Sequence, residues 1–415
     1  MKVKSFFTAL LIILAVAANA DTTVKGVYNV ADFGAKPDGI TDCTKAFQNA
    51  LNACDRAGGG VVKIPVGDFL FKGHLDVPRN VTIEGVASAP ARFDDHRSSR
   101  LLAVENKGKE DGEPFLYMRE CSAIKGLTIF YPEQSPDPEK VVAYPWTVRG
   151  DGDNINIEDV LMINPYKAVD FGTMPCGRHL VRNLFGSALK TGIFIDKCYD
   201  VGRLENIHFW PFWTEKMMKR TEKDATAFIF GRTDWEYVTG CFSIFYHVGI
   251  EFGDFGSGPG NVVMTNSGSD ICDTAVLVNN VQGHAGAAFT NCQFMGTVKV
   301  SPTNDGPVKF VNCGFWGTGE YKTASAALLR GKGNTVFSAC HFTNWDFAEI
   351  KAYAIDIDGG GLTVTGCDFM DKDKNYIKVG KNTDSAIITS NRFRGGEKVS
   401  VADGVEVQKG FNTNK

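Results

Sequence analysis

Short runs of alternating apolar and polar residues, broken by turn residues, fill the chain between residues 286 and 393. One phrase recurs there, in which a cysteine is followed two positions later by a phenylalanine. It occurs at Cys292-Gln293-Phe294, Cys313-Gly314-Phe315, Cys340-His341-Phe342 and Cys367-Asp368-Phe369, and a variant without cysteine ends at Phe393. The phenylalanines are 21, 27, 27 and 24 residues apart. Steps in the twenties are typical of a solenoid, whose units bury their apolar faces against their neighbours.

The repeated units are rich in Val, Ile, Phe and Thr and are interrupted by Gly, Asn and Asp, which indicates strands and turns rather than helices. We therefore predict an all-β fold, a right-handed single-stranded parallel β-helix. The chain has 11 cysteines, an odd number, and no CxxC cluster that would suit zinc. The recurring cysteines are expected to form an inward row of small apolar side chains.

A second phrase, small-apolar-x-apolar, precedes the first in most units. In a strand its apolar pair points inward and its x position points outward. The x positions predicted to line one outer face are Asp170, Phe194, Ile229, Glu251, Leu277, Lys299, Asp356 and Lys378. This parallel stack is the predicted surface for a long polymer.

The first twenty residues have the pattern of a secretory signal peptide. Lys2 and Lys4 precede an apolar run, and Ala18-Asn19-Ala20 supplies a small-residue cleavage site. We expect a secreted or periplasmic protein with one domain, residues 21–415. Within it we expect an N-terminal cap and first coils over 26–86, coils over 87–394 and a C-terminal tail over 395–415.

An amphipathic helix is predicted near the start of this domain, with Thr41 as its N-cap. Its apolar face is expected to contain Cys43, Phe47, Ala50, Leu51 and Cys54. Gly58-Gly59-Gly60 should end the helix, and Val61–Pro65 should begin a strand. Because the open end of a β-helix exposes core and unpaired backbone, this helix is predicted to act as a cap.

This opening resembles that of the pectate-lyase-like superfamily. The likeness rests on Ala31–Ala35, the helix, the glycine run, Val62–Pro65 and Gly67–Phe71. The superfamily includes polygalacturonase-like glycoside hydrolases, related glucanases and phage tailspikes. The resemblance implies a right-handed parallel β-helix and a polysaccharide ligand.

The polygalacturonase motifs themselves are not matched. Asn382-Thr383-Asp384 occurs only near the C-terminal end, Asp94-Asp95 lies before the regular coils, and Gly283-His284-Ala285 replaces Gly-His-Gly. The Arg-Ile-Lys phrase of that family is missing. No catalytic residues are therefore carried over from polygalacturonases.

Composition excludes several partners. The formal net charge is −4, with 22% charged and 43% apolar residues, which does not favour nucleic acid or a polybasic membrane surface. After the signal peptide no run approaches the roughly 20 apolar residues of a membrane span. The oligomeric state is left open.

Two turns are longer than the others, residues 131–145 and residues 210–224. Both fall after the second strand of a coil and before its outer-face strand, so they are expected to rise on the same edge as two walls. Asp170 and Asp196 would lie on the floor between them. With strands about 4.8 Å apart and a rise of about 3.3 Å per residue, their offset is roughly 8 Å.

That offset falls within the window of about 6.5–9.5 Å for the acid and base of an inverting glycosidase. We therefore predict glycosidic bond hydrolysis by Asp170 and Asp196, with Glu251 assisting, roughly 10 Å from Asp196. Acid and base are not assigned between the two aspartates, and no cofactor is expected.

Substrate-binding candidates surround this floor. Aromatic faces of the 210–213 loop suit sugar rings, although they could instead form a hydrophobic plug. Arg232 and Asp234 could form a subsite or simply pair at their turn. The candidates are Trp210, Trp213, Arg232, Asp234, Glu236, His247, Lys190 and Trp146.

Two alternatives stay open. A polysaccharide lyase would act by β-elimination on a uronic acid polymer, with Ca²⁺ as its cofactor. Calcium ligands would come from Asp151, Asp153, Asp159 and Asp170, and uronic acids would meet Arg178, Arg182, Lys190, Lys197 and Arg203. The other alternative is a non-catalytic carbohydrate-binding β-helix, like the shaft of a tailspike.

Overall fold

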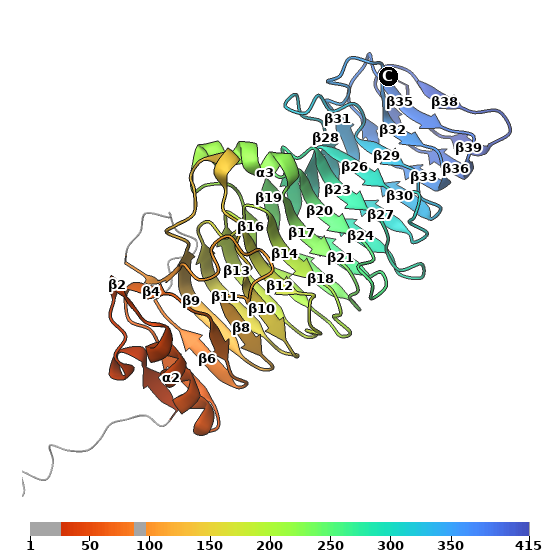
Figure 1. The fold of residues 1–415 in the computed structure, drawn as a ribbon. Helices are drawn as coiled ribbons and strands as arrows, with labels where there is room; N and C mark the ends of the chain where they lie inside the picture. Colours follow the sequence, from red (N-terminus) through yellow and green to blue (C-terminus); the bar gives the residue numbers. More distant parts are fainter. Residues whose placement is uncertain (1–25, 87–96, 415) are drawn as a thin grey trace, which may run out of the picture.

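A computed structural model describes residues 26–86 and 97–414 of the chain. The predicted signal peptide, residues 1–20, lies outside these described residues. The described chain winds into a long stack of coils in which the chain advances steadily from the N-terminal to the C-terminal end (Figure 1).

The coils form two parallel sheets. We call the 13-stranded one sheet B and the 26-stranded one sheet A. Sheet B consists of β5 (Leu75–Val77), β8 (Leu116–Arg119), β10 (Trp146–Asp151), β12 (Lys167–Phe171), β14 (Thr191–Ile195), β17 (Thr226–Phe230), β20 (Val248–Phe252), β23 (Thr274–Val278), β26 (Thr297–Val300), β29 (Ala327–Leu329), β32 (Tyr353–Ile357), β35 (Asn375–Val379) and β38 (Val399–Val401).

Sheet A takes two strands from most coils. Its strands are β1 (Val27–Asn29), β2 (Asp38–Asp42), β3 (Gly60–Lys63), β4 (Gly67–Phe71), β6 (Val81–Glu84), β7 (Ser99–Ala103), β9 (Ala123–Phe130), β11 (Asn156–Met162), β13 (Leu180–Gly186), β15 (Arg203–Glu205), β16 (His208–Phe209), β18 (Glu236–Thr239), β19 (Phe242–Ile244), β21 (Val262–Thr265), β22 (Gly268–Asp270), β24 (Ala287–Thr290), β25 (Gln293–Met295), β27 (Val308–Val311), β28 (Gly314–Trp316), β30 (Asn334–Ser338), β31 (His341–Thr343), β33 (Gly360–Thr365), β34 (Asp368–Phe369), β36 (Thr383–Thr389), β37 (Arg392–Phe393) and β39 (Glu406–Gly410).

One coil shows the winding rule. The chain runs from β14 in sheet B to β15 and β16 in sheet A and returns to sheet B as β17, which pairs in parallel with β14. Each unit therefore buries its apolar side chains against the units before and after it. The predicted parallel β-helix is confirmed.

The recurring cysteines and phenylalanines stack inside the coils. Cys292, Cys313, Cys340 and Cys367 are at most 2% exposed, and each thiol donates to a backbone carbonyl of the coil before it. The phenylalanines of the same phrase stack ring on ring; those of Phe315 and Phe342 are 4.9 Å apart and nearly parallel. The cysteines are free thiols, as an inward row of small apolar side chains requires.

The predicted helix is present as α2 (Thr44–Arg56), and its five expected apolar residues are fully buried. It begins later than predicted, because Asp38–Asp42 forms β2 and the Thr41 hydroxyl donates to the Asp38 carboxylate. The helix lies at the N-terminal end of the stack (Figure 1). Its role as a cap stays a prediction.

The register of sheet B fixes its outer row of side chains. Strand pairings align Asp76, Tyr117, Arg149, Asp170, Phe194, Ile229, Glu251, Leu277, Lys299, Leu328, Asp356, Lys378 and Ser400. The eight predicted x positions are all in this row. The row also extends further toward the N-terminus than the sequence indicated.

The two long turns do rise on the same edge of the stack, where they meet (Figure 1). Residues 131–145 contain the short helix η2 (Pro138–Lys140), and residues 210–224 contain η3 (Glu215–Met217) and α3 (Met218–Asp224). Lys223 of the second turn forms an ion pair with Glu139 of the first, with 3.8 Å between nitrogen and oxygen. The turns therefore touch each other instead of standing apart as two walls.

Two further observations complete the fold. Strands β38 and β39 continue both sheets within residues 395–415, where the sequence predicted a tail. Short helices also include η1 (Val30–Phe33). Within residues 26–86 and 97–414, no helix is long and apolar enough to cross a membrane.

Candidate active site on the outer face of sheet B

Asp170 occupies the outer row of sheet B but is 0% exposed. One of its carboxylate oxygens accepts from Arg149 Nε at 2.7 Å, and the other accepts from the backbone N–H groups of Gly172 and Thr173. The rings of Trp146 on β10 and Phe194 on β14 stack 6.4 Å apart across the intervening strand β12, which carries Asp170. Asp170 is thus a covered anchor for Arg149.

Asp196 is 2% exposed and is also fully engaged. One carboxylate oxygen accepts from the backbone N–H of Arg232, and the other accepts from the Ser257 hydroxyl at 2.9 Å. It therefore ties the turn after β14 to two later turns.

Asp170 and Asp196 lie on neighbouring coils, as predicted, since Asp170 pairs with Phe194, two residues before Asp196. The expectation of an open floor between them is wrong, because both carboxylates are covered and every oxygen accepts a hydrogen bond. Neither carboxylate is therefore open to a substrate. Their burial, and not their spacing, argues against the pair as acid and base.

A more open polar group lies further toward the N-terminus on the same face. Arg119 binds Asp76 through Nε and Nη2 and binds Asp151 through Nη1 at 2.9 Å. The Tyr117 hydroxyl donates to the same oxygen of Asp151 at 3.1 Å, and the Arg119 guanidinium lies 4.2 Å from the centre of the Tyr117 ring. Tyr117 and Arg149 are register neighbours.

We name Asp76, Tyr117, Arg119, Arg149 and Asp151 the tyrosine–arginine group. Burial, followed by the Asp151 carboxylate, raises the pKa of the Tyr117 phenol, while the guanidiniums of Arg119 and Arg149 act in the opposite direction. The phenol is therefore protonated at neutral pH and can donate. Arg149 uses only Nε internally, so its Nη groups have no hydrogen bond within the described residues.

A depression of about 560 Å³ adjoins this group. It is lined by Gln48 and Asn52 of helix α2 and by Asp76, Arg119 and Asp151. The tyrosine–arginine group was not predicted from the sequence. Tyr117 and Arg149 are 32 residues apart, because the 131–145 turn interrupts the repeat between them. The alternation in Leu116-Tyr117-Met118 and in Val148-Arg149-Gly150 could have indicated that Tyr117 and Arg149 point outward.

Glu251 is the one predicted catalytic residue that stays partly exposed. Its neighbours in the outer row are Ile229 and Leu277, both apolar. Burial raises the pKa of its carboxyl, and a hydrogen bond from Asn279 opposes that shift. Such surroundings suit a proton donor. No other carboxylate occupies the outer row within two coils on either side.

The predicted aromatic subsites are largely internal contacts. Trp210 packs against Phe185, His208 and Phe212 on the outside of sheet A, and Trp213 packs on the same cluster. The loop therefore forms the hydrophobic plug that was the alternative. Trp146 is only 9% exposed and contacts Phe194. Trp210 and Trp213 stay partly exposed, and their role in sugar binding stays a prediction.

Among the polar candidates, the prediction that Glu236 binds substrate is wrong. It is 0% exposed and bonded to His179 inside the coils, so it cannot contact a polymer.

The other polar candidates have partners or stay partly exposed. Arg232 and Asp234 pair at their turn, and Gln282 donates to Asp234. Lys190 pairs with Asp224 at 3.3 Å. His247 stays partly exposed beside the 210–224 turn, whose Thr221 carbonyl accepts its backbone N–H.

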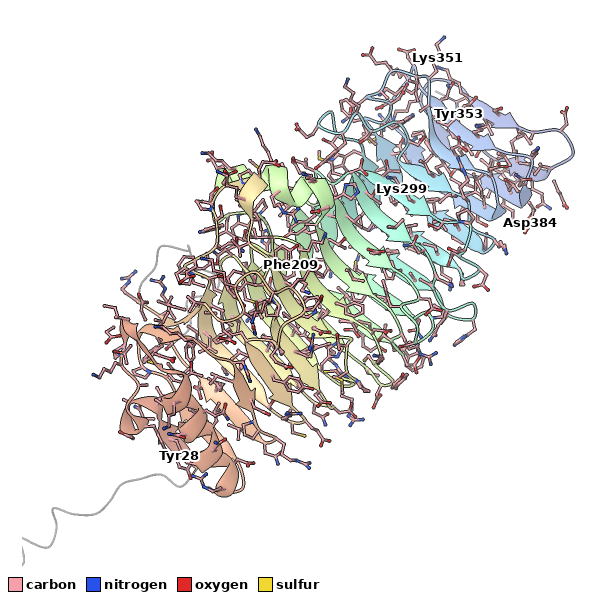
Figure 2. The ribbon with its side chains drawn as sticks, viewed as in Figure 1. Tyr28, Phe209, Lys299, Lys351, Tyr353 and Asp384 are labelled. Atoms are coloured by element: carbon pink, nitrogen blue, oxygen red, sulfur yellow. The ribbon has the colours of Figure 1, made fainter. Side chains whose placement is uncertain are left out.

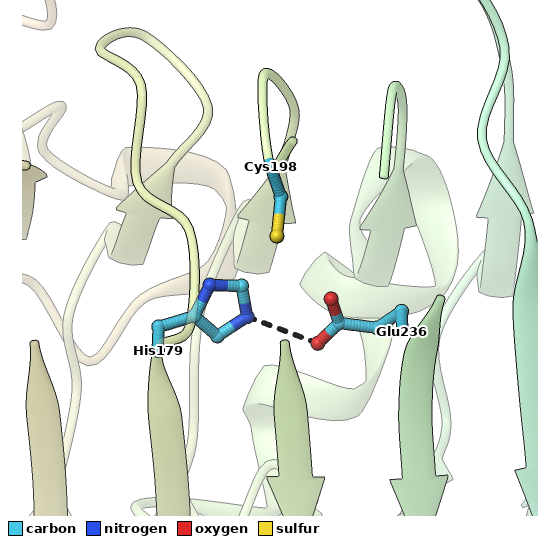
Figure 3. A group of neighbouring side chains, drawn as sticks. All are labelled: His179, Cys198 and Glu236. Carbon is cyan, nitrogen blue, oxygen red and sulfur yellow. Dashed lines mark hydrogen bonds and ion pairs between the residues drawn. The ribbon is translucent and has the colours of Figure 1, made fainter. Parts of the chain in front are cut away.

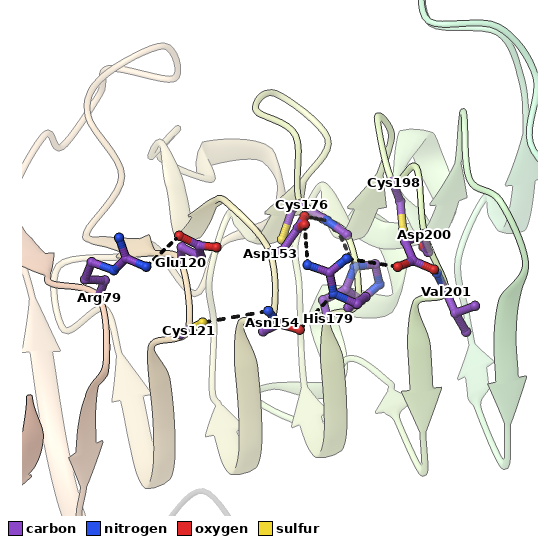
Figure 4. Close-up of polar contacts among 12 residues, drawn as sticks. Arg79, Glu120, Cys121, Asp153, Asn154, Cys176, His179, Cys198, Asp200 and Val201 are labelled. Carbon is purple, nitrogen blue, oxygen red and sulfur yellow. Dashed lines mark hydrogen bonds and ion pairs between the residues drawn. The ribbon is translucent and has the colours of Figure 1, made fainter.

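The carboxylates proposed as calcium ligands are not gathered. Asp153 pairs with Arg178, which also reaches Asp200 (Figure 4). Asp159 accepts from Asn183. Asp151 and Asp170 are held by arginines, as described above. Each carboxylate therefore has its own partner, and the four do not form a cage of oxygens.

His208 on strand β16 of sheet A gives the protein a defined acid response. Its ring packs against Trp210, Phe242 and Phe185, and burial lowers its pKa to about 4. The unfolded chain therefore binds an extra proton between about pH 6.5 and pH 4, so stability present above pH 6.5 is lost as pH falls through 4. We expect His208→Phe to remove this loss, measured as urea midpoints at pH 7, 5.5 and 4. His284→Gln, at an exposed histidine, should keep the wild-type acid response, and an unchanged response in His208→Phe would contradict the assignment.

Comparison with known proteins agrees with this architecture. Residues 27–121 match the family model described as rhamnogalacturonase A/epimerase, pectate lyase-like. Alginate lyase 7 of Azotobacter vinelandii is 54% identical over 46 residues, which cover 11% of this chain and 5% of the lyase. A polygalacturonase of Gossypium barbadense is 37% identical over 86 residues, 19% of this chain and 21% of the relative.

The described coils also resemble a solved structure. The pre-mature bacteriophage phi29 gene product 12 superposes with a TM-score of 0.63 at 13% identity, covering 96% of this chain and 55% of the phage chain. This likeness concerns the fold alone. These two relatives are polysaccharide-acting enzymes by name, but the chain spans only 5% and 21% of their lengths. The chain is therefore a parallel β-helix protein whose residues 27–121 match a pectate lyase-like family model.

Proposed function

We propose that this protein is an exported enzyme that acts on a uronic acid-containing polysaccharide by β-elimination. The polymer lies along the outer row of sheet B and reacts at the tyrosine–arginine group. The observation that carries the proposal is the Tyr117 phenol beside Arg149 in the outer row of sheet B, where the Nη groups of Arg149 have no hydrogen bond to any described residue.

Arg149 binds the carboxylate of the reacting uronate. A guanidinium recognises a carboxylate through paired N–H donors and neutralises its charge. That neutralisation makes the neighbouring C5–H bond easier to ionise, because the developing negative charge spreads onto the carboxylate. Buried Asp170 holds Arg149 at Nε and thereby orients its free donors. Asp170 is a positioning residue in this scheme.

Proton transfer involves Tyr117 and the carboxylates beside it. A carboxylate held by Arg119, either Asp76 or Asp151, takes the C5 proton; both are partly exposed. The electron pair of that bond forms the C4–C5 double bond, and the C4–O4 bond breaks. Tyr117 donates its proton to the departing O4, which leaves as a hydroxyl group.

The experiment is a comparison of products. The protein is incubated with polygalacturonate, polymannuronate and a neutral glucan, while new reducing ends and the absorbance of unsaturated uronates are recorded. We expect absorbance and reducing ends to rise together on a polyuronate, and a parallel assay with chelator tests calcium dependence. Reducing ends without absorbance would overturn elimination, and polymer binding without either product would favour the non-catalytic alternative.

Hydrolysis is the second candidate, favoured by Glu251. Its raised pKa and apolar neighbours Ile229 and Leu277 suit a general acid. If hydrolysis occurs, Glu251→Gln should lower turnover about 100-fold or more, because general acid catalysis contributes about 10²–10⁴-fold. Reducing-end release by this variant and by Asn279→Ala, which leaves the carboxyl in place, measures the effect. Full activity in Glu251→Gln would exclude the residue.

A further inference from the structure

A second site lies inside the coils, away from the outer face of sheet B. His179, Cys198 and Glu236 come from three successive coils, and each is buried. Their ligand-type atoms, one per residue, all lie within 4.8 Å of one another. Figure 3 shows the imidazole and the carboxylate facing each other, with the Cys198 sulfur above the gap between them.

The register explains how these side chains meet. Leu180 pairs with Arg203, and Arg203 pairs with Tyr237, so the preceding residues His179, Gly202 and Glu236 align on three coils. A Cβ at Gly202 would overlap Glu236 Oε2 and His179 Nε2. Glycine at the middle position therefore leaves the space in which the two side chains face each other. The neighbouring coil continues the row with apolar Val262.

The hydrogen bonds fix which atoms face this space. His179 Nδ1 lies 2.8 Å from the Cys176 carbonyl oxygen, which can only accept, so Nδ1 carries a proton. In a neutral ring, Nε2 is then an unprotonated acceptor, yet it lies 2.9 Å from the Glu236 Oε1, another acceptor. A proton, carried by the ring or by the Glu236 carboxyl, or a metal ion must therefore lie between them.

We propose that His179, Cys198 and Glu236 bind a divalent transition metal ion, zinc(II) first among them. Imidazole nitrogen, thiolate sulfur and carboxylate oxygen are the donors that zinc takes in proteins. Ligating histidines usually give their other N–H to a carbonyl, as His179 does to Cys176. Glu236 is oriented in the same way, since its second oxygen accepts from the Thr233 hydroxyl.

For the imidazole and the carboxylate the required adjustment is small. With zinc about 2.0 Å from nitrogen and oxygen, tetrahedral ligands are about 3.3 Å apart, so Nε2 and Oε1 would separate by a few tenths of an ångström. Cys198 donates its S–H to the Asp200 carbonyl, a proton that it releases on binding metal. The ion would join three coils at one point and stabilise the stack. This site is independent of the proposed elimination chemistry.

The test compares metal content and stability in the full-length mature protein. Wild-type protein is unfolded in denaturant and refolded with zinc, with cobalt(II) or with a chelator. We expect about one equivalent of metal after refolding with zinc, and a higher melting temperature than after refolding with chelator. Cobalt(II) should give a sulfur-to-metal absorption band.

Variants identify the ligands. Cys198→Ser should lose the sulfur-to-cobalt band. His179→Gln should retain no more than about one tenth of the zinc that wild type retains. Cys241→Ser, at another buried cysteine outside the triad, should behave as wild type in both respects. Folded wild-type protein that takes up no metal, and melts identically with zinc and chelator, would overturn the proposal and leave a buried imidazolium–carboxylate pair.

Discussion

Tyr117→Phe is expected to lower turnover on the preferred polyuronate by about 100-fold or more, since proton transfer by a positioned side chain contributes about 10²–10⁴-fold. The substitution removes one oxygen atom, and the ring keeps its contact with Arg119. Substrate binding by Arg149 should persist, so KM should change little while kcat falls. Initial rates of unsaturated product formation across substrate concentrations measure both constants.

The matched control is Tyr237→Phe on β18, a tyrosine that is 46% exposed and lies on sheet A. It should retain wild-type kinetics. Circular dichroism and melting temperature establish that both variants are folded. Wild-type kcat in Tyr117→Phe would remove the phenol from the mechanism, whereas an increase in KM alone would make Tyr117 a binding residue.

Phe315→Ala is expected to lower the free energy of unfolding by about 3–5 kcal/mol, the usual cost of replacing a buried phenylalanine by alanine. The Phe315 side chain is 0% exposed, and four rings surround it at 4.9–5.6 Å: Phe294, Phe310, Phe337 and Phe342. Removing it leaves a cavity that neighbouring coils cannot fill without breaking their hydrogen-bonded register.

Urea unfolding followed by tryptophan fluorescence measures this loss. Val311→Ala, on the strand β27 that precedes Phe315 and 40% exposed, should change the free energy of unfolding by about 0.5 kcal/mol or less. Hydrogen exchange should show the Phe315→Ala effect concentrated in the coils that contact residue 315, because repeats interact mainly with their nearest neighbours. An effect below about 1 kcal/mol would show that the stacked rings contribute less than burial implies.

The sequence by itself determined the winding. Cysteine and phenylalanine recur at steps of 21 to 27 residues, and stacking of the repeated units buries these side chains. The parallel β-helix and its inward rows followed from this pattern. The alternation within the second phrase likewise identified eight outer-row positions, all of which the strand register places in one line. Side-chain direction in a strand is a local property, which is why the sequence was sufficient for it.

The tertiary structure decided which of those outward residues is available for chemistry. Asp170 points outward by its register, yet Arg149, Trp146 and Phe194 cover it, and these come from other coils. Glu236 meets His179 because Gly202 on the coil between them has no side chain. Burial and pairing depend on which side chains the neighbouring coils place over a residue. Inserted turns such as 131–145 lengthen the chain between neighbouring strands, so the repeat alone does not predict which residues become neighbours.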